Sequence, residues 1–198
     1  MPHPFEGPTL TPRKRAFLAG HAGLQNDGDI TMLAPGAAPR TCDACRVLSQ
    51  GWADQWVRVQ RRLDCVRAIY SGRAGGSEAA IDDVQAFFES VHHLKDWLGN
   101  DAMSGITKAD GDALINSSAT LQVCADLANG TKHLVLTSTR TGDLGTSIAR
   151  NDVTVFAGTG TAAHKFYVAS GSTELDVLDL AERAVSEWAA FLHSRGLM

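Results

Sequence analysis

The segment Val123-Cys-Ala-Asp-Leu-Ala-Asn-Gly-Thr-Lys-His133 marks the change from helices to strands, because it ends a helical region and precedes the first strand-like run. At about 100° per residue, one helical face carries apolar residues that predict a core contact: Leu121, Cys124 and Ala128. The opposite face carries a polar ridge: Gln122, Asp126, Asn129 and His133. The ridge has two interpretations, a solvated face that stops at Asn-Gly or a functional surface.

The composition is that of a soluble globular protein. Of 198 residues, 44% are hydrophobic and 20% charged, and the formal net charge is −4. This charge argues against broad electrostatic binding of nucleic acid, although it leaves room for a local basic site. The four cysteines, without a recognisable signal peptide, predict a reducing, cytoplasmic setting. No apolar run approaches the length needed to span a membrane.

Proline is confined to one end of the chain. All six prolines lie at or before Pro39, which predicts an irregular N-terminal arm over residues 1–40 and a separate domain over residues 41–198. The arm carries the basic cluster Arg13-Lys14-Arg15, which we interpret as solvated tail charge rather than a phosphate site. The absence of proline further on favours long helices.

Apolar residues at steps of three and four predict four helices. The first runs at most from Cys42 to about Gly72, the second from Ser77 to Gly99-Asn100, and the third from about Asp110 into the segment quoted above. The fourth begins near Ser172 or Thr173 and ends before Gly196.

The period changes to that of strands between the third and fourth helices. Three short runs predict an antiparallel meander: residues 134–137, 152–156 and 165–168. The Gly158-Thr-Gly-Thr161 sequence between two of them lacks the lysine and following helix of a phosphate loop, so it predicts a turn. The predicted fold class is mainly α (α+β), a four-helix bundle with a small antiparallel β meander inserted before the last helix.

The second helix carries a candidate acid–base pair. His92 and Asp96 are four residues apart and therefore neighbours on one side of the helix, where a carboxylate can fix the imidazole tautomer and raise its pKa. The other interpretation is a surface pair that only orders the helices. We expect His92 and Asp96 to meet Asp126, Asn129 and His133 in a shared cleft.

The cysteines and histidines do not demand a metal or another cofactor, and none is predicted. Cys42-Asp-Ala-Cys45 is a lone CxxC at a helix start, without the βαβ setting of a thioredoxin-like protein or the two further ligands of a zinc site. A metal site of His92, Asp96 and His133 is conceivable, but the spacing does not require it.

The sequence Asn129-x-x-x-His133 resembles the RNxxxH signature of HEPN-domain proteins. These are small α-helical bundles, often dimeric, and many are metal-independent ribonucleases of toxin–antitoxin and phage-defence systems. In such enzymes the motif arginine and histidine act on the RNA 2′-hydroxyl and phosphate. The resemblance places Asn129 and His133 at the polar residue and the histidine of the motif, whereas Ala128 stands at the position of the motif arginine. The HLKDW sequence ending at Trp97 and DLANGxKH over residues 126–133 are also similar to a group of uncharacterised bacterial proteins.

Two classes of function follow from the sequence. One is a HEPN-like protein acting on RNA or a nucleotide, with His133, Asn129, Asp126, His92 and Asp96 as catalytic residues and Lys132 and Lys95 as substrate-binding residues. The alternative is a non-catalytic helical interaction module, associated with defence or phage. Both are compatible with a homodimer, which we expect because the long first helix exposes Trp52 and Trp56 on or near its apolar stripe, where four helices need not cover both.

Overall fold

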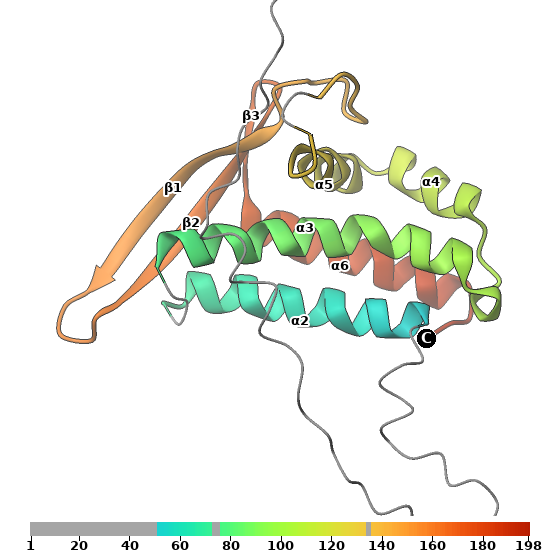
Figure 1. Cartoon of the computed structure of the whole chain (residues 1–198), viewed down its shortest axis with the longest axis horizontal. Helices are drawn as coiled ribbons and strands as arrows, with labels where there is room; N and C mark the ends of the chain where they lie inside the picture. The colour runs from blue at the N-terminus through green and yellow to red at the C-terminus, as the bar shows by residue number, and fades with distance from the viewer. Residues whose placement is uncertain (1–50, 73–75, 134–135) are drawn as a thin grey trace, which may run out of the picture. The chain divides into compact units, whose positions relative to one another are not determined.

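The computed structural model describes residues 51–72, 76–133 and 136–198 (Figure 1). In these residues the protein is mainly helical, with five α-helices, one short 3₁₀ helix and a three-stranded sheet. The elements, in chain order, are α2 (Trp52–Tyr70), α3 (Ser77–Asn100), η2 (Ala102–Ser104), α4 (Lys108–Ser117), α5 (Ala119–Gly130), β1 (Ser147–Phe156), β2 (Thr161–Ser170), β3 (Thr173–Asp176) and α6 (Val177–Ser194). The predicted N-terminal arm and the Cys42–Cys45 pair lie outside the described residues.

The predicted four-helix bundle is not confirmed, because the third predicted helix is two helices. Ser118 has an extended backbone between α4 and α5, and its hydroxyl accepts a hydrogen bond from the Leu121 amide (3.0 Å), which caps the start of α5. Helices α2, α3 and α6 lie side by side, whereas α5 is seen end-on in Figure 1 and so crosses them steeply. Helix α5 contacts both α3 and α6.

The sheet confirms an antiparallel meander before the last helix. The predicted runs 152–156 and 165–168 lie within β1 and β2, but the third strand is not the predicted run 134–137. The strand order is β1-β2-β3, and both pairings are antiparallel. Residues 136 and 137 are not in a strand, while 134 and 135 lie outside the described residues. Strand β3 occupies residues where the last helix was expected to begin, and α6 begins only at Val177. The turn between β1 and β2 is confirmed, with positive φ at Gly158 and Gly160.

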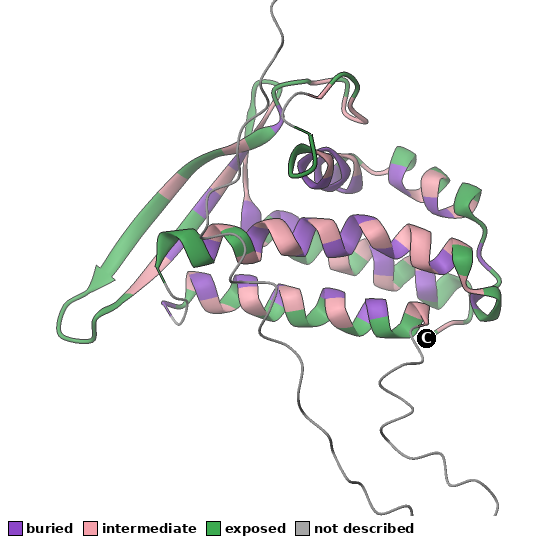
Figure 2. Cartoon of the chain, viewed as in Figure 1, coloured by how far each residue is buried: buried purple, intermediate pink, exposed green. Residues whose placement is uncertain are grey.

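The core lies between the helices and one face of β2 (Figure 2). Its largest fully buried side chains include Trp188, Phe87, Phe88 and Phe166. The expectation that α2 exposes Trp56 is wrong, since Trp56 is only 6% exposed and belongs to this core. Trp52 is partly buried and packs against it. In contrast, β1 is exposed along most of its length.

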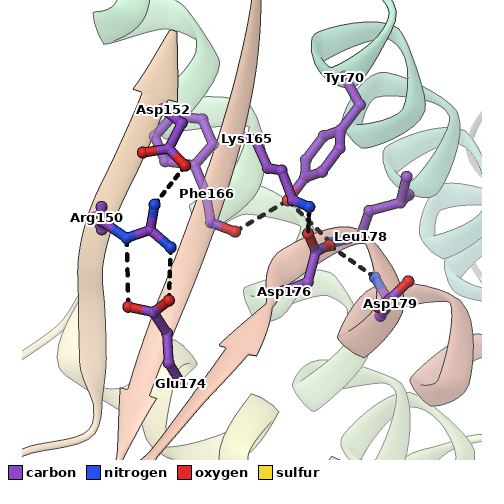
Figure 3. A network of polar contacts seen from close by, with 9 residues as sticks. All are labelled: Tyr70, Arg150, Asp152, Lys165, Phe166, Glu174, Asp176, Leu178 and Asp179. Carbon is purple, nitrogen blue, oxygen red and sulfur yellow. Dashed lines mark hydrogen bonds and ion pairs between the residues drawn. The ribbon is translucent and has the colours of Figure 1, made fainter.

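A tyrosine joins the sheet to the helices (Figure 3). The Tyr70 hydroxyl, at the end of α2, donates to the Phe166 carbonyl of β2 (3.0 Å) and accepts from the Leu178 amide of α6 (3.2 Å). Partial burial and the charge of Asp176 raise the pKa of Tyr70, so the hydroxyl keeps the proton that it donates. Asp176 also caps α6 by accepting from the Leu178 amide (2.8 Å). The Tyr70 hydroxyl therefore links α2, β2 and the start of α6.

Candidate functional site

The polar ridge expected on α5 is solvated only in part. Asp126 is fully buried, with 0% of its surface exposed, and the preceding residues Thr120, Leu121, Val123, Cys124 and Ala125 are buried too. The segment that leads from α5 to β1 covers this side of the helix, while α3 covers another. The simple rule that polar residues opposite a core stripe face solvent fails here, since α5 is packed from both sides.

Asp126 holds the segment between α5 and β1. Its Oδ1 accepts from the Arg140 amide (2.6 Å), and its Oδ2 accepts from the Thr141 amide (2.9 Å) and the Thr141 hydroxyl (2.7 Å). We call Asp126, Arg140 and Thr141 the Asp126 cluster. Both oxygens of the carboxylate are occupied, so the cluster satisfies a buried charge with donors from the chain itself.

The Arg140 side chain extends the cluster to α4 and α3. Its guanidinium contacts Asp112 Oδ1 (2.8 Å) and Asn116 Oδ1 (2.5 Å). Lys95 of α3 meets the same Asp112 oxygen (3.2 Å) and lies 3.7 Å from Asp96. Lys95, predicted to bind substrate, is thus engaged in internal ion pairs, and Arg140 is a cation that the sequence analysis missed.

His92 is a buried, neutral histidine. It is 8% exposed, and burial, followed by the charges of Lys95 and Arg140, lowers its pKa from 6.5 to about 4. The expected raised pKa is wrong: Asp96 opposes the shift, but burial outweighs it. Within the described residues no hydrogen bond joins His92 to Asp96, and His92 Nδ1 has no partner.

The neighbouring histidine, His93, contacts a residue just after α5. Lys132 Nζ lies 2.8 Å from His93 Nε2, and we call these residues the His93–Lys132 pair. An ammonium group only donates, so Nε2 accepts and the imidazole is neutral, with its proton on Nδ1. Partial burial, followed by the charge of Lys132, lowers the pKa of His93, in agreement with the neutral form.

A second contact fixes the end of α5 beside this pair. Thr131 donates from its hydroxyl to Glu89 Oε1 of α3 (2.6 Å) and to the Ala128 carbonyl (2.8 Å). Glu89 and His93 are one helical turn apart on α3, and the residues that meet them, Thr131 and Lys132, are consecutive just after α5. Together the two contacts hold the Lys132 side chain against α3.

The structure therefore brings some of the predicted site residues together. Lys95 meets Asp96, whereas Lys132 meets His93, which was not among the predicted residues. Asn129 is half-buried at the end of α5 and His133 is exposed just beyond it, where its amide donates to the Asn129 carbonyl (3.2 Å). In the described residues no hydrogen bond or ion pair of the His133 side chain links it to His92 or Asp126. The sequence offered one signal for His93. It is adjacent to His92 on a helix, so the two side chains point in different directions and contact different residues.

Residues 51–72, 76–133 and 136–198 lack two further features. No three His, Cys, Asp or Glu side chains there are grouped as ligands for a metal ion. None of the helices there is both long and apolar enough to cross a membrane. Cys124 is fully buried, which raises the pKa of its thiol.

Comparison with known proteins finds no match among protein-family models, curated proteins or solved structures.

Proposed function

We propose that the chain is a HEPN-like protein that acts on RNA or a nucleotide as a metal-independent ribonuclease of a defence or toxin–antitoxin type system. The observation that carries the proposal is the 2.8 Å contact between Lys132 Nζ and His93 Nε2. It combines a cation for phosphate with a neutral imidazole for proton transfer, the two groups that phosphodiester cleavage requires.

The pair supplies what the motif resemblance lacks. Ala128, at the position of the motif arginine, is fully buried and offers no charge. Lys132 is exposed at the C-terminal end of α5, where the helix dipole stabilises a cation. Lys132 therefore takes the place of the arginine in this proposal, and His93 joins His133 and Asn129 as a functional residue.

The chemistry follows from the resting contact. A phosphate oxygen attracts the Lys132 ammonium and releases His93 Nε2, which accepts the proton of the RNA 2′-hydroxyl. The 2′-oxygen attacks phosphorus, and the bond to the 5′-oxygen breaks as that oxygen takes a proton from His133. The products are a 2′,3′-cyclic phosphate and a 5′-hydroxyl. A lowered pKa at His93 keeps the base unprotonated at neutral pH.

Cleavage assays on purified RNA test the proposal. His93→Gln and Lys132→Met should each abolish cleavage while leaving the melting temperature within a few degrees of the parent protein, since both side chains lie at the surface of α3 and α5. His193→Gln, at an exposed histidine near the C-terminal end of α6, is the matched control. Cleavage that survives both substitutions would reject the assignment of the pair.

The second candidate is a non-catalytic helical interaction module, associated with defence or phage. The contacts of Asp126, Asp112 and Lys95 favour this candidate, because these charged side chains form hydrogen bonds and ion pairs within the fold. It predicts no RNA cleavage and no effect of phosphate on the His93 ring. A homodimer and a cytoplasmic location remain proposals, and light scattering that reports a monomer at high micromolar concentration would reject the dimer.

A further inference from the structure

A pocket has Thr131, the residue before Lys132, in one of its walls. It has a volume of about 270 Å³ and is formed by the first half of α3, the end of α5 and the start of β1. Ligand pockets start at roughly 300 Å³, so this one suits part of a ligand, on the scale of a single ring system. Its walls include Ile81, Gln85, Phe88, Leu127, Gly130 and Thr131.

Two elements connect the pocket to the pair. On α3, Gln85, Glu89 and His93 are spaced by four residues, so they follow one side of the helix from the pocket to the pair. At 1.5 Å per residue, Gln85 and His93 are about 12 Å apart along the axis. On the α5 side, Thr131 is a wall of the pocket, and the next residue is Lys132.

The pocket combines apolar surface with a free amide. Phe88, Ile81 and Leu127 provide aromatic and aliphatic walls. The hydroxyls of Thr131 and Thr146 are already used in contacts with Glu89 and with Asp143. In the described residues the Gln85 side chain has no hydrogen-bond partner, so its amide can offer one donor and one acceptor to a ligand.

We propose that this pocket binds the adenine base of a ligand whose phosphate lies at His93 and Lys132. A glutamine amide pairs with the donor and acceptor edge of adenine, N6 and N7, and unstacked bases bind in pockets with aromatic walls. The distance of about 12 Å along α3 between Gln85 and His93 favours a ligand that has more than one phosphate group. Adenosine triphosphate and an adenine within RNA both fit this description. The phosphate half of this proposal rests on the proposed function.

Calorimetric titration of the full chain with four probes tests the inference: adenosine, inorganic triphosphate, adenosine triphosphate and a non-cleavable triadenylate with 2′-O-methyl groups. We expect adenosine triphosphate or the triadenylate to bind more tightly than inorganic triphosphate. Adenosine should compete with the tighter-binding of these two ligands. That ligand identifies the source of the base. Cytidine triphosphate should bind no more tightly than inorganic triphosphate.

Two variants locate the base. Gln85→Leu should weaken adenine nucleotide binding about tenfold, the discrimination expected of one amide–base pair, and leave triphosphate binding unchanged. Gly130→Leu places a side chain at a pocket wall where a Cβ meets no atom within 4 Å, and should abolish the advantage of the nucleotide over triphosphate. Its folding should be preserved, because leucine favours a helix more than glycine does. Gln60→Leu on the exposed side of α2 is the control.

The outcomes separate this inference from the proposed function. NMR signals of the His93 ring are followed in the same titrations. If triphosphate shifts these signals but the nucleotide binds no more tightly than triphosphate, or neither variant weakens nucleotide binding, the pocket assignment is wrong and the phosphate site stands. If adenosine binds and Gly130→Leu prevents it while triphosphate has no effect on His93, the base pocket stands and the phosphate site is wrong. Absence of binding by all four probes overturns both.

Discussion

Asp126 and Lys132 lie near each other in the sequence at the end of α5, yet the structure uses their charges differently. Asp126 is fully buried, and its two oxygens receive three hydrogen bonds from residues 140 and 141. Lys132 is exposed, and its ammonium group contacts a histidine rather than an acid. A buried charge with all of its partners supplied stabilises the fold, whereas two basic groups in contact at the surface are not needed for it. The second arrangement is the better candidate for ligand binding.

Asp126→Asn should cause the largest loss of stability. The amide nitrogen of asparagine would face a backbone N–H, so at least one charge-assisted hydrogen bond is replaced by two donors in a buried site. We expect a loss of about 3 kcal/mol, equivalent to a fall in melting temperature of about 6–12 °C for a chain of this length. Asp82→Asn, at an exposed position of α3, is the control and should change the melting temperature little. Equal melting temperatures for the two variants would contradict the role of Asp126 in the fold.

His92 should make stability depend on pH. Its pKa of about 4 in the folded protein lies below the ordinary value of 6.5, so between these values the unfolded chain binds more protons. The contribution is complete above pH 6.5 and is lost as the pH falls through 6.5 to 4, with a total of about 3 kcal/mol.

Urea unfolding at several pH values from 7 to 4 measures this contribution. His92→Leu should unfold with a flatter pH dependence than the parent protein over that window, because it removes the group whose protonation favours unfolding. Its stability at pH 7 should change little, because leucine also removes a buried nitrogen that has no partner. His193→Gln serves as the control, and parallel curves for His92→Leu and the parent protein would show that His92 is not buried in solution.

Thr141→Val should have a smaller effect than Asp126→Asn. The variant removes one hydrogen bond to Asp126 Oδ2, the one from the hydroxyl, and keeps the one from the backbone amide. We expect a loss of about 1–2 kcal/mol by urea unfolding, compared with a negligible change for Thr154→Val on the exposed strand β1. A loss as large as that of Asp126→Asn would show that the hydroxyl, rather than the carboxylate, organises the segment before β1.

Sequence periodicity predicted the parts of the fold in which one apolar stripe meets one core. It identified α3 with its observed ends and most of α6, because both helices have one buried face. It missed the break between α4 and α5, where the signal is a single serine that caps a helix. It found only the second half of β1, because this strand is exposed along most of its length and its first half lacks a regular apolar alternation.

The structure arranges the predicted site residues differently from the sequence interpretation, for a related reason. Periodicity assigns a residue to a helical face but does not say what else covers that face. The segment between α5 and β1 buries Asp126, and contacts between elements, not spacing within one helix, select His93 over His92 as the partner of Lys132. Arg140 lies in a region without periodicity, so its contact with Asp112 had no local signal.

Lys132→Met should have the smallest effect on stability and a clear effect on one histidine. The exposed side chain contributes little to folding, so the free energy of unfolding should change by no more than about 0.5 kcal/mol. The Lys132 charge lowers the pKa of His93, after partial burial, so its removal should raise that pKa toward the ordinary value for histidine. Titration of the His93 ring followed by NMR measures the shift, and Lys108→Met, an exposed lysine at the start of α4, should leave it unchanged. In the parent protein, added phosphate should also raise the pKa of His93, because an anion beside the ring favours the imidazolium. If Lys132→Met leaves the His93 titration unaltered, the two side chains are not in contact in solution, and the difference between the Asp126 cluster and the His93–Lys132 pair would then be one of burial alone.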